Sequence, residues 1–63
     1  DYRGAHVAMG WQGRTLLGTV RDVYRNETRG YWHAHVYHFN GEPWPIEPAL
    51  GALEILERTY SED

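Results

Sequence analysis

The sequence predicts an α+β fold, a small three- to four-stranded antiparallel β-meander with a C-terminal amphipathic helix packed on one face. Three observations predict it. Strand-like runs rich in Val, Thr and aromatic residues fill the first two thirds of the chain, glycine-containing turns separate them, and the apolar spacing changes to three and four residues after Pro48. The 63 residues suit a single small domain over 1–63, complete or cut from a longer protein, since the chain begins at Asp1.

The first two strands are expected at Ala5–Met9 and Arg14–Tyr24. Between them, Gly10–Gly13 predicts a turn, because its two glycines adopt positive φ at little cost. The alternation of the second strand breaks at Gly18, which indicates a bulge or a close backbone contact there.

The third strand, Tyr31–Phe39, follows a polar connection over residues 25–30. Asn40-Gly41 then predicts a type I′ turn, which needs positive φ at both central residues. Prolines on both sides of Trp44 limit residues 42–46 to a short edge strand, because proline cannot donate to a ladder.

The C-terminal helix is expected from about Pro48 to Tyr60. A proline suits the first helical turn, although Gly51 weakens the helix by roughly 1 kcal/mol relative to alanine. One helical face would collect the apolar residues Ala49, Ala52, Leu53, Leu56 and Tyr60. The alternative is an SH3-like five-stranded β-barrel, with a short 3₁₀ turn at Pro48–Gly51 and a last strand at Leu53–Arg58.

Composition restricts the kinds of protein that this chain can be. It has no cysteine, so a disulfide or a thiolate zinc site cannot stabilise it, and large aromatic residues must supply the core. No apolar run approaches the ~20 residues that cross a bilayer. We therefore expect a soluble, cytoplasmic protein with no membrane contact.

Charge is unevenly distributed along the chain, whose net charge is −3. Residues 1–41 hold five arginines against three acidic residues, whereas residues 42–63 hold six acidic residues against one arginine. Such a split is typical of a protein with oriented partners.

The third strand supplies the candidate working surface. Period two places Trp32, Ala34 and Val36 on the core side, together with His38. The other side holds Tyr31, His33, His35, Tyr37 and Phe39. The leading hypothesis is a non-catalytic binding module that contacts a protein partner, or a second copy of itself, through this aromatic face. Its predicted partner-binding residues are Tyr31, His33, His35, Tyr37 and Trp44. Two simpler interpretations remain open: the face only stabilises the sheet, and Trp44 is a hydrophobic plug.

Nucleic-acid binding through the same face is the alternative. Exposed rings stack on bases and arginines pair with phosphates; the candidates are Arg14, Arg21, Arg25 and Arg29. "YRG" at residues 2–4 and "GYWHAHV" followed by "NG" resemble AP2-type and phage-integrase arm-binding domains. That resemblance implies a three-stranded sheet that reads DNA and a helix behind it, and it assigns no binding residue here.

Metal binding and catalysis find little support. His33 and His35 would lie on one face of a strand, but a metal site needs a third ligand, and the spacing does not choose between His6 and Glu42. No cysteine nucleophile, glycine-rich phosphate loop or acid–base pair is evident. We therefore predict no enzyme activity, no cofactor, no metal and no small-molecule substrate.

Overall fold

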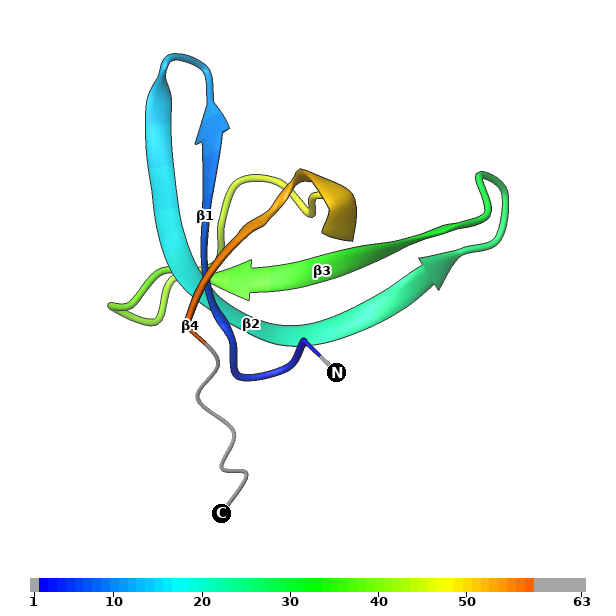
Figure 1. Ribbon diagram of the computed structural model, residues 1–63, viewed down its shortest axis with the longest axis horizontal. Helices are drawn as coiled ribbons and strands as arrows, with labels where there is room; N and C mark the ends of the chain where they lie inside the picture. Colours follow the sequence, from blue (N-terminus) through cyan, green and yellow to red (C-terminus); the bar gives the residue numbers. More distant parts are fainter. Residues whose placement is uncertain (1, 58–63) are drawn as a thin grey trace.

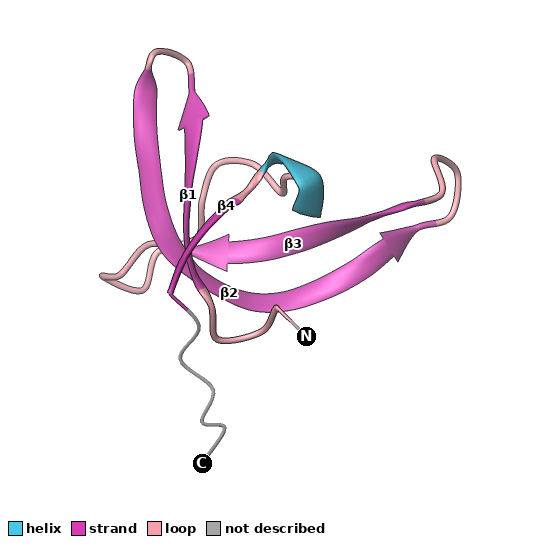
Figure 2. Ribbon diagram, viewed as in Figure 1, coloured by secondary structure: helices cyan, strands magenta, loops and turns pink. Residues whose placement is uncertain are grey.

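The computed structural model describes residues 2–57, which form a curled antiparallel sheet of four strands (Figure 1). In chain order these are β1 (His6–Trp11), β2 (Arg14–Asn26), β3 (Tyr31–Tyr37) and β4 (Glu54–Glu57). Their order in the sheet is β3-β2-β1-β4, and one 3₁₀ turn, η1 (Leu50–Ala52), precedes β4 (Figure 2).

The long strand β2 joins the two halves of the sheet. Its first half pairs with β1 and its second half with β3, and it bends so far that the two hairpins point in different directions (Figure 1). The register with β3 shifts between Val20 and Asp22, which leaves Arg21 as an extra residue. Bulges of this kind increase the local bend and twist of a strand.

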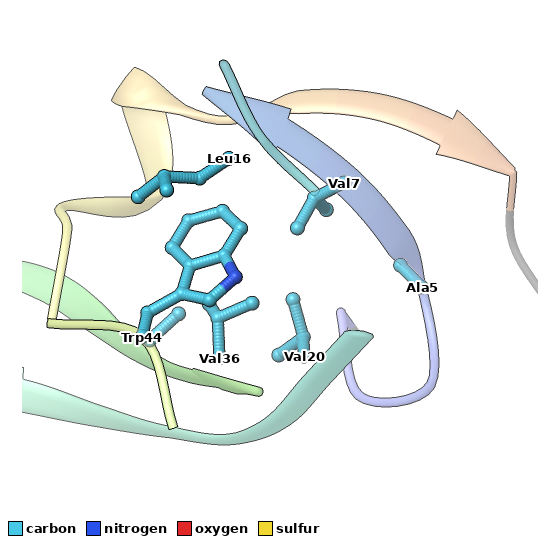
Figure 3. Close-up of a cluster of buried hydrophobic side chains, with 7 residues drawn as sticks. Ala5, Val7, Leu16, Val20, Val36 and Trp44 are labelled. Carbon is cyan, nitrogen blue, oxygen red and sulfur yellow. The ribbon is translucent and has the colours of Figure 1, made fainter. Parts of the chain in front are cut away.

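The core lies inside this curl and is small. Its buried apolar residues are Ala5, Val7, Leu16, Val20, Ala34, Val36 and Trp44. The indole of Trp44 lies among the smaller aliphatic side chains (Figure 3) and is only 5% exposed. Its Nε1–H donates to the carbonyl oxygen of Leu17 at 3.1 Å, so its one polar atom is satisfied.

Gly18 makes room for this indole. A Cβ at this position would clash with the carbonyl oxygen of Tyr37 and lie 2.7 Å from Nε1 of Trp44. The close backbone contact expected at Gly18 is therefore confirmed, and the register shift falls farther along β2, at Arg21.

The type I′ turn occurs at Gln12-Gly13. Both residues have positive φ, 50° and 78°, and they join Trp11 and Arg14 in a two-residue hairpin loop. The prediction of this turn at Asn40-Gly41 is wrong, because only Gly41 has positive φ there. Its amide donates to the carbonyl oxygen of His38 at 2.8 Å.

The predicted α+β class and its C-terminal helix are wrong. Between Pro48 and Glu57 the only helical residues are those of η1, and β4 then pairs with β1. The SH3-like alternative anticipated both a 3₁₀ turn and a last strand here, although residues 2–57 form four strands and not five. Tyr60 lies outside the described residues.

Strand pairing explains this outcome. A strand at residues 54–57 pairs with the free edge of β1 and turns Ile55 toward the core cluster, while Leu56 stays exposed. A helix would leave that edge unpaired. The sheet face on which the helix was predicted to pack is covered by Trp44. Pro43, next to it, makes an isolated bridge to Tyr37.

Within residues 2–57, no helix has the length and apolar character needed to span a bilayer. The cytoplasmic location expected from the sequence stays a prediction.

Gly18→Ala is expected to destabilise the protein by about 1–3 kcal/mol, because an added methyl group overpacks the contact with Trp44 and the backbone at Tyr37. Gly10→Ala is the matched control: Gly10 also lies in a strand, its φ is not positive, and nothing lies within 4 Å of its missing Cβ. Urea unfolding of both variants measures the difference. Equal stability of the two would contradict the role given to Gly18.

Candidate functional site

The outer face of the β2–β3 hairpin collects the aromatic side chains of β3. Alternation places Tyr31, His33, His35 and Tyr37 on this face, and the register adds Tyr24, which lies directly opposite His33. None of these five rings is buried. They are called the ring face below. Sequence reasoning missed Tyr24, which the period of β2 identifies once the hairpin register is known.

The rings contact one another across the two strands. Tyr24 stacks on His33 with ring centroids 5.4 Å apart and an interplanar angle of 14°. The centroid of Tyr24 also lies 5.0 Å from that of His35, and Tyr31 lies 5.2 Å from His33. Cross-strand ring pairs of this type stabilise a hairpin and restrict the rotamers of its side chains.

Glu47 connects the proline-containing segment after β3 to the ring face. Its carboxylate accepts a hydrogen bond from the Tyr24 hydroxyl at 2.7 Å and lies 3.3 Å from Nδ1 of His35. One residue later, the carbonyl oxygen of Pro48 accepts the amide of Ala34 at 2.9 Å. This part of the proline-containing segment therefore runs along the outer edge of β3.

Both ring nitrogens of His33 lie within hydrogen-bonding distance of a partner. Nδ1 lies 2.8 Å from the carbonyl oxygen of Glu47 and must donate to it, so this nitrogen carries a proton. Nε2 lies 3.3 Å from Nδ2 of Asn26, whose Oδ1 is already engaged by the amide of Arg29 at 3.0 Å. Nε2 is therefore placed to accept from Asn26, so both ring nitrogens of His33 are engaged.

These contacts do not assemble a metal centre. The described residues contain no group of three metal-ligating side chains. His6, one of the two residues considered as a third ligand, contacts the ring of Phe39 at a centroid distance of 5.2 Å. The described part of the chain also has no pocket.

Two tryptophans exchange the positions expected of them. Trp44, predicted to bind a partner, lies in the core and matches the hydrophobic-plug interpretation. Trp32, predicted for the core, is 47% exposed, so that prediction is wrong. It lies on the inner side of the hairpin with Ala34, but one step beyond the part of β3 that η1 and the Trp44 indole cover.

The four candidate arginines separate into two groups. Arg14 pairs with Trp11 beside the β1–β2 turn, at the end of the other hairpin. Arg21, Arg25 and Arg29 all lie along the β2–β3 hairpin or in its turn. The guanidinium carbon of Arg21 lies 4.1 Å from the ring centroid of Tyr37, a cation–π arrangement.

Comparisons with protein-family models, curated proteins and solved structures find no match. Function is therefore inferred from the geometry of this surface.

The Tyr24–Glu47 pair predicts a titration that can be measured. The hydrogen bond to Glu47, followed by desolvation and the carboxylate charge, raises the pKa of Tyr24 above its ordinary value of 10.0. The raised pKa means that the folded state holds this proton more tightly than the unfolded chain does. The pairing therefore contributes stability below about pH 10, and the contribution is lost as the pH rises through the folded pKa.

Glu47→Gln is expected to lower the pKa of Tyr24 toward that of free tyrosine, because it removes the charged acceptor. Tyrosinate absorbance titration measures it, with Tyr24→Phe identifying the contribution of this ring. Glu42→Gln, in the exposed loop after β3, is the matched control and should leave the titration of Tyr24 unchanged. A wild-type curve for Glu47→Gln would show that the hydrogen bond has no such effect.

Proposed function

We propose that this protein is a small non-catalytic binding module that contacts a protein partner, another protein or a second copy of itself, through the ring face. One observation carries the proposal. The five rings lie side by side on the outer face of a hairpin, each only partly covered and each held by a neighbouring ring or side chain.

Preorganisation makes such a surface suitable for binding. Association is opposed by the entropy of ordering side chains, and rings already fixed by cross-strand contacts lose less of it. Tyrosine and arginine are among the residue types most enriched at interface hot spots, and both stand at the Arg21–Tyr37 pair. The partner-binding residues kept in this proposal are Tyr31, His33, His35 and Tyr37, with Tyr24 added and Trp44 removed.

Nucleic acid is the alternative partner, and the arginines of the β2–β3 hairpin favour it. The charge balance opposes it, because the chain carries −3 overall and counterion release favours basic proteins. A carboxylate also belongs to the surface itself, since Glu47 is bonded to Tyr24 and lies next to His35. We therefore rank a protein partner first.

A photo-crosslinking amino acid at Tyr37 should capture a protein from nuclease-treated extract of the source cells, or a second copy in purified samples. The same group at Leu17 is the control, since Leu17 is also exposed but lies in the half of β2 that pairs with β1. A captured protein counts only if the unlabelled chain competes it away. Capture at both positions, or at neither, would overturn the proposal.

Tyr37→Ala should weaken binding of the identified partner at least about thirty-fold, which corresponds to a hot-spot loss of ~2 kcal/mol. This loss should depend little on the salt concentration. Leu17→Ala should leave binding unchanged. Binding isotherms measure both, and ¹H–¹⁵N spectra establish that each variant is folded. If labelled protein instead shows saturable, salt-sensitive shifts on the ring face with an oligonucleotide, nucleic acid replaces protein as the partner.

A further inference from the structure

The β2–β3 hairpin pairs three arginines with three aromatic rings. Arg21 lies over Tyr37, and Nη1 of Arg29 lies 3.4 Å from the hydroxyl of Tyr31. Arg25 lies directly opposite Trp32 in the ladder. The last two pairs occupy the end of the hairpin, and their residues, Arg25, Arg29, Tyr31 and Trp32, are called the hairpin tip below.

These three arginines are exposed, and none of the carboxylates described in residues 2–56 pairs with them. The ion pairs of the described residues involve Arg3 with Asp22, at 3.8 Å, and His35 with Glu47. Asp22 and Glu47 are thus already engaged, which leaves Glu27 in the turn. The hairpin therefore carries uncompensated positive charge, although the whole chain has a net charge of −3.

The hairpin tip projects beyond the core. Figure 1 shows the ends of β2 and β3 extending past η1, with the turn at the far end of the molecule. Tyr31 is 40% exposed and Trp32 is 47% exposed. Because adjacent residues of a strand point to opposite faces, the tip offers one arginine–ring pair on each side.

We propose that the hairpin tip binds an acidic segment of the protein partner. The guanidinium groups of Arg25 and Arg29 form bidentate hydrogen bonds with Asp or Glu carboxylates, and the two rings exclude water from those bonds. This inference rests on the proposed function, that the partner is a protein, and adds which chemistry the partner presents.

The charge of the chain favours carboxylates over phosphates. A nucleic acid is a continuous polyanion, which would bring its charge close to Glu27 and Glu47 as well as to the arginines, in a chain that is already acidic. A short acidic segment needs only a few paired contacts. All six basic residues of the chain are arginine, whose planar fork forms bidentate hydrogen bonds with a carboxylate or a phosphate, so the choice between the two anions rests on charge.

Titration of ¹⁵N-labelled full-length protein with a poly-glutamate peptide tests the inference. The indole N–H signal of Trp32, assigned with Trp32→Phe, and the amides of residues 25–32 should shift saturably and less at high salt. Arg25→Gln and Arg29→Gln should each weaken this binding by roughly tenfold or more, the effect of losing one charge-assisted hydrogen bond. Arg14→Gln is the matched control, since Arg14 is exposed at the end of the other hairpin.

Three results would overturn the inference: no shift at the hairpin tip, an equal loss in Arg14→Gln, or tighter binding of oligothymidylate than of poly-glutamate at these residues. The first two leave the proposed function standing if Tyr37 still crosslinks to a protein. If Arg25→Gln does not affect the binding of a protein captured at Tyr37, this fourth result would also overturn the inference and leave the proposed function standing. Failure of crosslinking at Tyr37 would instead remove the proposed function.

Discussion

The contact between the Trp44 indole and Gly18 is the constraint on which the rest of this fold depends. Apart from Trp44, the buried core residues are only alanines, valines and Leu16, so its ring, which enters from outside the sheet, is the largest side chain of the core. That ring fits because Gly18 has no side chain, and its nitrogen is satisfied by Leu17. An indole seated in the bend of β2 holds the two hairpins in their curled arrangement.

The same contact determines where the ring face receives its support. Once Trp44 is seated and its amide donates to Val36 at 2.9 Å, the stiff residues after it must run along the edge of β3. Glu47 then lies beside Tyr24 and His35, and its carbonyl oxygen meets His33. A substitution at Gly18 that displaces Trp44 is therefore expected to affect the ring face through the backbone of residues 44–47.

Local sequence patterns predicted the strands well and the cover of the sheet poorly. Alternation located β3 and its outward rings, and the glycine at position 18 signalled a close contact, because both depend on neighbouring residues. The spacing of Ala49, Ala52, Leu53 and Leu56 is compatible with a helix as well as with the 3₁₀ turn and strand that form. The unpaired edge of β1, which only the assembled sheet reveals, decides for a strand. The exchange of Trp32 and Trp44 has the same origin, since period two assigns a side chain to a face but not to the part of that face which another segment covers.

In the β2–β3 hairpin, the rings that stabilise the sheet are also the rings to which we assign the proposed binding role. Between Ala34 and the turn, the described residues of the hairpin include no buried apolar side chain, so the order of this part rests on its ladder and on ring contacts such as Tyr24–His33. Those contacts involve the rings of Tyr24, His33 and His35, and hydrogen bonds engage both nitrogens of His33. They leave Tyr31 and Trp32 exposed beside arginines without acidic partners, although neither ring is needed for the core. Structural demand therefore accounts for the contacts within the ring face, whether or not it binds a partner as proposed. At the tip that demand ends, and the exposed rings and arginines there are the features on which the proposed binding of an acidic segment depends.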